Sequence, residues 1–292
     1  MPKHYKKWFI FTLLFLGIGY FSGFLTGWWK AKGTIGLFPK VAKETRLLVI
    51  APHPDDETLI AGGLIQKSLE TGGKVKILFL TNGDGSRETV LREAKKADFS
   101  PQEYLSLGEQ RMQEAVLAAA VLGVKKEDLV FLGFPDRGLE KLGVSPATKF
   151  NHVPYQGTLH PQQTYSAENL LADIKEVVDN FKPTIVVTTH LRDLHPDHRT
   201  AFLFTQRLRQ EEGANWPVYA VVVHFRGYPT KGGYLIPPKK LFGSDWLSFM
   251  LSDAQRQKKL EALKKHQSQF ANYNDKLLFS RMSAKNEIFE QE

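Results

Sequence analysis

The sequence predicts an α/β protein with a mostly parallel sheet that is covered by helices on both faces. Continuous apolar runs rich in β-branched residues, such as residues 46–51 and 185–189, are typical of strands buried in a parallel sheet. Amphipathic stretches such as residues 167–180 lie between these runs and have the helical period. Strands that alternate with helices indicate parallel strands joined by helical crossovers.

The predicted elements follow one another in a regular order along the chain. Strands are expected at residues 46–51, 74–80, 129–132, 185–189 and 218–224. Helices are expected at residues 57–69, 107–122, 167–180, 197–210 and 252–269. Residues 86–104 and 137–165 are expected to be irregular, and a loop as long as the second is often a binding lid. Residues 239–251 are interpreted as a hairpin or short helix, and the polar tail from Asn272 carries no predicted element.

The N-terminal segment predicts a membrane anchor. Residues 8–29 are 22 uncharged residues, enough to span a bilayer, with tryptophans near both ends. A cleaved signal peptide fits less well, because the apolar core is too long and Gly-Trp-Trp-Lys-Ala-Lys is a poor cleavage site. A short basic tail before the span favours an extracytoplasmic catalytic domain, although the lysines after it do not. The expected organisation is a tail at 1–7, a transmembrane anchor at 8–29, a linker at 30–45 and a catalytic domain at 46–292.

The formal net charge of +8 lies mainly in this N-terminal segment. Residues 1–45 hold seven of the 39 basic residues and one of the 31 acidic residues, so the rest of the chain carries only +2. This distribution argues against a nucleic-acid-binding protein. The chain has no cysteine, so any metal must be held by histidine, aspartate or glutamate.

Two strand ends carry dense groups of histidines and acids. The first strand is followed by His53, Asp55, Asp56 and Glu57, and the strand at 185–189 is followed by a second group. The members of the second group are His190, Asp193, His195, Asp197 and His198. Sites in open α/β sheets lie beyond the carboxyl ends of the strands, and imidazoles with carboxylates that converge there suit a divalent metal. The alternative is that Asp56 and Asp197 only cap the helices that follow.

Five motifs resemble those of the PIG-L deacetylase family, also called LmbE-like, over about residues 45–270. They are Ala51-Pro52-His53-Pro54-Asp55-Asp56-Glu57, Gly108-Glu109-Gln110-Arg111-Met112-Gln113-Glu114, Leu132-Gly133-Phe134-Pro135-Asp136, Asp193-Leu194-His195-Pro196-Asp197-His198, and Lys259 with His266-Gln267-Ser268-Gln269. The resemblance implies a Rossmann-like fold and a zinc-dependent hydrolase, with Fe²⁺ as another possible metal. Its members remove the acetyl group from N-acetylglucosamine units of glycans, glycolipids or sugar conjugates.

The same resemblance implies roles at the first strand end and at the end of the second group. His53, Asp56 and His198 match the metal ligands, and Asp55 matches the general base. A set of two histidines and one carboxylate leaves a position for water on zinc, whose pKa the metal lowers toward about 7. A general base beside that water contributes roughly 10²–10⁴-fold to the rate.

The remaining roles concern the oxyanion and the sugar. The resemblance implies that His195 is the acid or the oxyanion stabiliser, oriented by Asp197; Asp193 is an alternative partner for a ring N–H. Arg111 and Asp136 match sugar-binding positions, although Arg111 could instead pair with a glutamate on its own helix and Asp136 could be a turn residue.

Two other functions remain as alternatives. An amidase on the same metal site would release a larger acid than acetate from a thiol-sugar conjugate. A non-catalytic glycan-binding module would lack one of the catalytic groups, and here every expected metal and acid–base position is filled.

Overall fold

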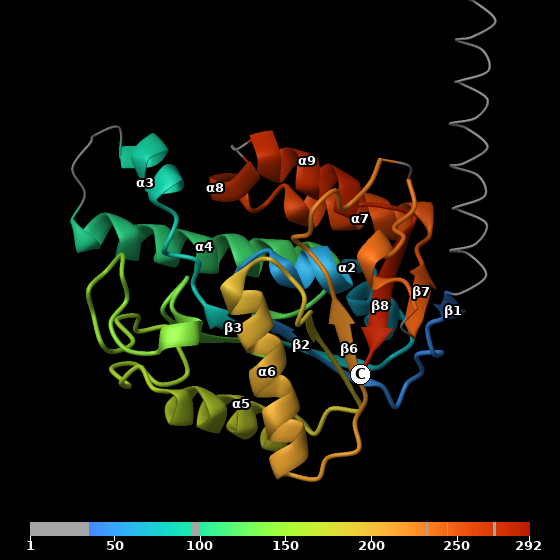
Figure 1. The fold of residues 1–292 in the computed structure, drawn as a ribbon, viewed down its shortest axis with the longest axis horizontal. Coiled ribbons are helices and arrows are strands. Elements are labelled where there is room, and N and C mark those ends of the chain that lie inside the picture. Colours follow the sequence, from blue (N-terminus) through green and yellow to red (C-terminus); the bar gives the residue numbers. More distant parts are fainter. Residues whose placement is uncertain (1–34, 95–99, 232, 244, 271–272) are drawn as a thin grey trace, which may run out of the picture.

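The computed structural model describes residues 35–94, 100–231, 233–243, 245–270 and 273–292, which form one sheet between two layers of helices (Figure 1). The strands of this described part have the spatial order β1-β7-β8-β6-β5-β2-β3-β4. Their bounds are β1 Gly36–Leu37, β2 Arg46–Ala51, β3 Lys74–Thr81, β4 Leu129–Phe134, β5 Ile185–Thr189, β6 Val218–Val221, β7 Trp246–Met250 and β8 Asn286–Gln291.

The strands from β4 to β6 are parallel and make up the predicted half of the sheet. Counted along the chain from β2, they have the order 3-2-1-4-5, which is that of a Rossmann-like sheet. The prediction of an α/β fold with a mostly parallel sheet is therefore confirmed. The order reverses between β2 and β5, so the crevice for a ligand is expected beyond the ends of these two strands.

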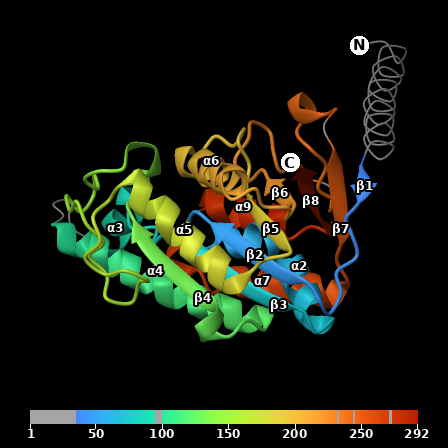
Figure 2. The same ribbon diagram turned by 90° about the horizontal axis from the view of Figure 1, so that it is seen from below.

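Helices cover both faces of the sheet, as Figures 1 and 2 show. One face carries α2 Asp56–Glu70, α4 Pro101–Leu122, α7 Asp253–Leu263, α8 Gln267–Phe270 and α9 Tyr273–Met282, and the other carries α5 Ala167–Phe181 and α6 Pro196–Glu211. The strand β2 explains the two layers, because Leu47 and Val49 pack into the core on the α2 side while Leu48 and Ile50 pack on the α5 side. An unbroken apolar run is what a strand buried on both faces requires.

The C-terminal part differs from the prediction. The tail from Asn272 was expected to carry no element, but it forms α9 and then β8, which lies antiparallel between β6 and β7. Its centre is apolar and buried at Ile288 and Phe289. The predicted helix at 252–269 is divided into α7 and α8.

Smaller differences concern the start of the chain and one connection. Residues expected to be irregular after β3 include α3 (Arg87–Ala94) and the first turns of α4. Within the predicted linker, Gly36–Leu37 pairs with β7. The predicted transmembrane anchor at residues 8–29 lies outside the described residues. None of the described helices is long and apolar enough to cross a bilayer.

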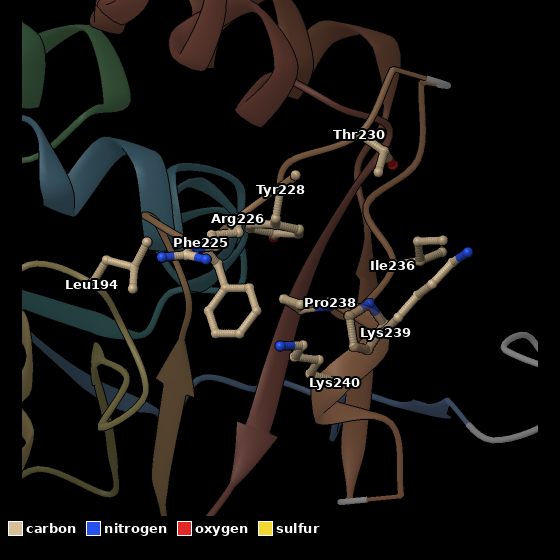
Figure 3. Close-up of a pocket in the computed structure, with 11 residues that line it drawn as sticks. Leu194, Phe225, Arg226, Tyr228, Thr230, Ile236, Pro238, Lys239 and Lys240 are labelled. Atoms are coloured by element: carbon tan, nitrogen blue, oxygen red, sulfur yellow. The ribbon is translucent and has the colours of Figure 1, made fainter.

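Two loops at the β6 edge of the parallel sheet face each other across a cavity (Figure 3). One follows β6 and the other leads through the 3-10 turn η3 (Lys239–Leu241) to β7. The connection from β4 to α5, at 135–166, is long and contains only the short turn η2 (Leu139–Lys141), as the sequence predicted.

Candidate metal centre

Both histidine-rich groups lie at the point where the strand order reverses. The neighbouring strands β2 and β5 run parallel with Ile50 opposite Thr188, so they end at the same edge of the sheet. The helix α2 then leaves to one face and α6 to the other. This divergence opens the crevice in which α/β proteins bind ligands.

The first group is held in an unusual backbone conformation. Asp55, at φ 145° and ψ −30°, lies in a region that side chains rarely adopt, and such strain is found mainly at functional sites. Its carbonyl accepts hydrogen bonds from Thr58 N and Leu59 N at 3.1 and 3.0 Å, which begins α2. Its own N–H donates to Glu57 Oε2 at 3.0 Å. Asp56, the expected cap, is instead the first residue of α2, and its Oδ2 accepts from His53 N at 3.0 Å.

The second group begins α6. His195 is the residue before the helix, Pro196 takes the first helical position, and His198 follows one turn later with a fully buried side chain. Asp193 Oδ1 accepts from His195 N at 2.9 Å, and its Oδ2 accepts from Val223 N and His224 N at 2.8 and 2.9 Å. These bonds connect the β5 and β6 ends and fix the histidines between them.

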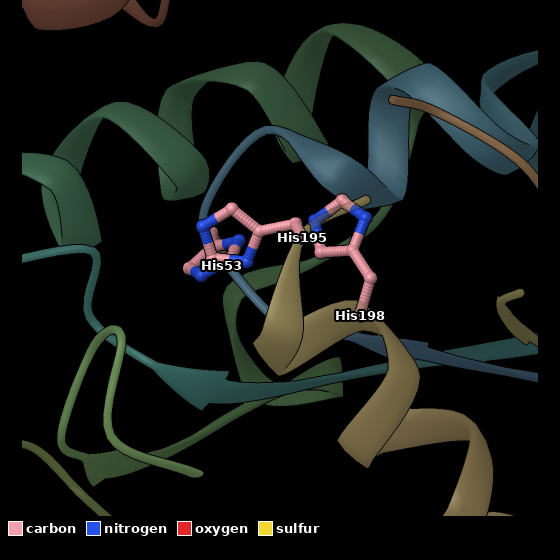
Figure 4. Close-up of side chains that lie close together, drawn as sticks. All are labelled: His53, His195 and His198. Atoms are coloured by element: carbon pink, nitrogen blue, oxygen red, sulfur yellow. The ribbon is translucent and has the colours of Figure 1, made fainter. Parts of the chain in front are cut away.

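The three predicted histidines converge in the crevice, as Figure 4 shows. The ring centroids of His53 and His195 are 4.6 Å apart, those of His53 and His198 5.3 Å, and those of His195 and His198 5.0 Å. The three rings can each offer a nitrogen within 4.8 Å of the others. His53, His195, Asp136 and Asp197 form a second such set, in which one nitrogen or carboxylate oxygen of each residue lies within 4.8 Å of the others.

The carboxylate of Asp56 lies between two of these histidines. Asp56 Oδ2 lies 3.1 Å from His53 Nδ1 and 3.2 Å from His198 Nε2, so one carboxylate oxygen contacts both rings. The opposite nitrogens face other carboxylates: His198 Nδ1 is 3.2 Å from Asp193 Oδ2, and His53 Nε2 is 3.1 Å from Asp197 Oδ2. Metal-bound histidines usually donate their second N–H to a carboxylate in this way.

Two further features of His198 and His53 suit a divalent metal. Both ring nitrogens of His198 are buried, and although they are close to carboxylates, neither makes a hydrogen bond of good geometry with another described residue. Burial by itself lowers the pKa of His53 and His198, but the surrounding carboxylates raise the pKa of His53 well above its usual value and that of His198 to about 10. The carboxylates therefore favour positive charge at this place, which a divalent cation would supply.

His195 has the opposite electrostatic environment. Burial and the neighbouring His53 and His198 lower the pKa of His195 to about 2, so its ring is neutral. Its Nδ1 is buried and has no hydrogen-bond partner in the described part of the chain. Asp55 differs again, because burial and the nearby Asp56 raise the pKa of the Asp55 carboxyl well above its usual value.

Comparison with known families agrees with this geometry. The PIG-L family profile, described as GlcNAc-PI de-N-acetylase, matches residues 48–208. The chain belongs to the PIG-L family. The resemblance inferred from the motifs is confirmed, and the matched PIG-L region contains most of β2, all of β5 and both histidine-rich groups.

Curated relatives in the PIG-L family share part of their length with this chain. A 1D-myo-inositol 2-acetamido-2-deoxy-alpha-D-glucopyranoside deacetylase from Mycobacterium sp. (strain KMS) is 33% identical over 157 residues, 52% of this chain and 46% of the relative. The protein of the same name from Thermobifida fusca (strain YX) is 30% identical over 168 residues, 56% of this chain and 54% of the relative. The match thus spans about half the length of these relatives.

Solved structures share the fold of this PIG-L chain. The zinc inhibited form of teicoplanin deacetylase Orf2 superposes with a TM-score of 0.59 at 20% identity, covering 85% of this chain and 97% of that one. The N,N'-diacetylchitobiose deacetylase from Pyrococcus horikoshii superposes with a TM-score of 0.52 at 19% sequence identity, covering 84% of this chain and 83% of that one. GalB, a 4-carboxy-2-hydroxymuconate hydratase from Pseudomonas putida, superposes with a TM-score of 0.57 at 17% sequence identity, covering 85% of this chain and 95% of that one. Because a hydratase shares the fold with deacetylases, the fold alone does not define the reaction.

The structure brings the predicted site residues together but changes several of their partners. The hydrogen bonds of Asp197 in the described residues go to the ring of His53 and to the N–H groups of Arg137 and Leu139, not to His195 as predicted. Asp136 also contacts His53, with Oδ1 3.2 Å from Nε2, and its Oδ2 accepts from Gly85 N.

Arg111 lies beside the site with most of its donors occupied. It donates through Nη1 to Gly83 O, through Nε to Ser268 Oγ at 3.3 Å and through Nη2 to Thr89 Oγ1 at 3.4 Å. Its side chain is buried, and Ser268 in turn donates to Glu114, so the expected alternative pairing with that glutamate runs through a serine. Arg111 therefore positions the loop after β3 in this PIG-L structure.

His224, Asp84 and Tyr155 were not among the predicted site residues, although His224 was considered as structural or substrate-lining and the turn with Asp84 as a possible substrate contact. The ring of His224, just past β6, lies 5.1 Å from that of His198. Asp84 is buried near Asp136 and accepts from Tyr155 Oη at 2.7 Å. The sequence signal that could have identified His224 and Asp84 is their position just after parallel strands, where the predicted ligands also lie.

Proposed function

We propose that this chain is a metal-dependent N-deacetylase that removes the acetyl group from an N-acetylglucosamine-containing glycan, glycolipid or sugar conjugate. The observation that carries the proposal is the convergence of His53, Asp56 and His198 at the β2 and β5 ends of a PIG-L family chain. The named activity of the relatives, deacetylation of a 2-acetamido sugar linked to inositol, supports the substrate class.

His53, Asp56 and His198 would hold the metal. Two imidazoles and one carboxylate suit both zinc and Fe²⁺. When bound, the metal supplies Lewis acidity, which polarises the amide carbonyl and lowers the pKa of water. The description of one structural neighbour as zinc-inhibited makes the choice between zinc and iron part of the test.

Asp55 would be the general base. In the described part of the chain its carboxylate makes no hydrogen bond, and its backbone is held by Glu57, so the side chain is free to accept a proton. Asp55 would take the proton of the attacking water and return it to the amine nitrogen as the C–N bond breaks. A positioned base contributes roughly 10²–10⁴-fold to the rate.

His195 and Asp136 would act on the substrate. A neutral His195 can donate its one ring N–H to the carbonyl oxygen as negative charge develops there, which is the role of an oxyanion-hole donor. Asp136 would accept a hydroxyl of the sugar, while Arg111 would contribute by holding the loop at Gly83. Asp197 would orient His53, and Asp193 would orient His198.

The decisive experiment measures acetate release by the full-length protein in detergent, loaded separately with zinc and with Fe²⁺. The substrates are N-acetylglucosamine, chitin oligomers, GlcNAc-inositol and GlcNAc-lipids, and the control is Asp55→Asn. We expect release from one substrate class, lost by at least about 100-fold in the variant while bound metal is unchanged. Full activity of Asp55→Asn would refute the base assignment. A folded, metal-loaded protein that releases no acetate from any substrate would refute the deacetylase itself.

The uncharged segment at residues 8–29 would anchor the enzyme, with its catalytic domain on the extracytoplasmic side. Fractionation of cells that express the full chain tests this proposal, with a chain beginning at residue 30 as the matched comparison. The full chain is expected in the membrane fraction after a high-salt wash, with the catalytic domain digested by protease added outside intact spheroplasts. Recovery of the full chain in the soluble fraction would contradict the anchor.

A further inference from the structure

The peptide unit between Pro54 and Asp55 is held at both of its polar atoms. Its N–H, on Asp55, donates to Glu57 Oε2 at 3.0 Å. Its carbonyl oxygen, on Pro54, accepts from Nε2 of the buried Gln269. Because φ of Asp55 describes rotation about the bond that joins this peptide unit to the Asp55 Cα, the two hydrogen bonds fix the unusual φ of 145°. Strained backbone conformations persist only where the surrounding structure over-determines them.

The carboxylate of Glu57 is oriented by the residue just before α8. Its Oε1 lies 3.3 Å from Nε2 of His266, which is fully buried, and also accepts from Thr58 Oγ1. Because a carboxylate only accepts hydrogen bonds, His266 Nε2 is the donor in this contact. The His266 carbonyl accepts from Gln269 N and Phe270 N at 3.1 and 2.8 Å. His266 and Gln269 therefore act together on the two sides of one peptide unit.

The segment at residues 266–269 is attached to α4 through its other polar residue (Figure 1). Ser268 N and Oγ donate to the two carboxylate oxygens of Glu114 at 2.9 and 2.7 Å, and Arg92 Nη2 donates to Ser268 O. Within the segment only Gln267 is exposed. The donors of His266 and Gln269 are thus carried by a fixed segment and directed at the loop that contains Asp55.

We propose that Gln269 and His266 are positioning residues that hold Asp55 in the orientation required of the general base. The inference rests on the proposed function, because both residues act through the proposed base. Rotation of the held peptide unit moves the Asp55 carboxylate, and a misplacement of about 1 Å can lower a rate by about 100-fold. Asp56 is held separately, since its Oδ2 accepts from His53 N at 3.0 Å and its N–H donates to His53 O at 3.2 Å. Loss of the two donors should therefore affect the base more than the metal ligands.

Gln269→Met, which keeps the side-chain length and removes the donor, tests the direct contact in the full-length, metal-loaded protein. We expect kcat to fall about tenfold with KM and bound metal unchanged, because the base acts in the transition state. Gln267→Met makes the same change at the exposed position of the segment and is the matched control. A kcat of Gln269→Met equal to that of the control, or a loss of bound metal, would overturn the proposal.

Two variants of His266 test the contact through Glu57. His266→Leu removes the donor and should also lower kcat about tenfold at unchanged KM. His266→Gln places an amide N–H near the position of Nε2, so it should lower kcat less than His266→Leu does. Equal losses of kcat in the two variants would show that the volume of the ring matters and not its donor, which contradicts the proposal.

Hydrogen exchange of the metal-free proteins, followed by mass spectrometry, separates this proposal from the proposed function. In Gln269→Met and His266→Leu we expect peptides that cover residues 53–59 to exchange about tenfold faster, with peptides of β5 and β6 unchanged. This result supports the hold on Asp55 even if the parent releases no acetate. Exchange at the parent rate, or equally faster exchange throughout the sheet, overturns the proposal even if the parent is an active deacetylase.

Discussion

Two groups of histidine and carboxylate side chains lie at the end of β5, and only one of them has the arrangement of a metal site. The first is the centre formed by His53, Asp56 and His198. The second joins His190, directly after β5, to Glu290 and Glu292 at the C-terminus. His53 and His198, taken with His195, satisfy the same distance requirement as the second group, because in each set the potential ligand atoms lie within 4.8 Å of one another.

The difference between the two groups is the hydrogen bonding of the imidazoles. His190 Nδ1 accepts from Arg192 N at 2.8 Å, so the proton is on Nε2, which bonds to Glu290. Metal binding through Nε2 would require an imidazolate. His53 and His198 each face carboxylates with both nitrogens, so each can bind a metal through one and donate the other N–H. The groups that face the two ring nitrogens, rather than proximity alone, distinguish the first group from the second.

The largest expected effect comes from removing one histidine of each group. His198→Gln should weaken zinc binding by more than about 100-fold, because it removes a ligand. The matched variant His190→Gln keeps a donor toward Glu290 and should bind zinc as the parent does. Competition with a chelating dye measures both affinities, and circular dichroism checks that both variants fold. Loss of zinc in His190→Gln with retention in His198→Gln would reverse the comparison.

A smaller effect is expected from the excess of carboxylates around the first group. Burial and the neighbouring Asp136 raise the pKa of Asp84 from 3.8 to about 7. The folded state therefore holds a proton that the unfolded state releases, and the stability of the metal-free protein should fall as the pH rises from about 4 to about 7. Asp84→Asn keeps an acceptor for Tyr155 and should be more stable than the parent above pH 7 by up to about 4 kcal/mol, with no difference below pH 4.

Urea unfolding of the metal-free parent and of Asp84→Asn at several pH values measures this difference. Two stability curves that stay parallel from pH 4 to pH 8 would show that Asp84 has no raised pKa. The stability of Glu290→Gln, measured by urea unfolding at the same pH values, is the comparison for a carboxylate of the second group.

The smallest expected effect concerns the position of Asp55. Glu57 accepts the Asp55 N–H through Oε2, and its Oε1 lies 3.3 Å from Nε2 of the buried His266. Glu57→Gln removes one of these acceptors, so the strained backbone of Asp55 is held less well, and kcat should fall about tenfold with KM and metal content unchanged. Glu70→Gln, an exposed change on the same helix, is the control. A change confined to KM would contradict a positioning role.

The parallel half of the fold and the convergence of the two histidine-rich groups were predictable because their signals are local. The apolar runs of β2 and β5 need burial on both faces, and the polar residues that follow each run must then lie at one edge of the sheet. The choice of partners was less predictable. Asp197 and Asp193 both follow β5, and which histidine each contacts depends on where α6 begins.

The strand β8 was missed because its buried polar residues look like those of a solvated tail. Glu287 is buried, yet it pairs with Lys259 at 2.7 Å and accepts from Gly63 N and Leu64 N in α2. These partners are between 28 and 224 residues away in the chain, so no local pattern indicates them. Paired in this way, a carboxylate can be buried without the cost of an isolated charge.

Anomalous diffraction at the zinc absorption edge, from crystals of the zinc-loaded protein, tests the central difference most directly. The account predicts one strong peak between His53, Asp56 and His198, and none beside His190, Glu290 and Glu292. A peak at the second group, or a zinc-loaded crystal without a peak at the first, would contradict it.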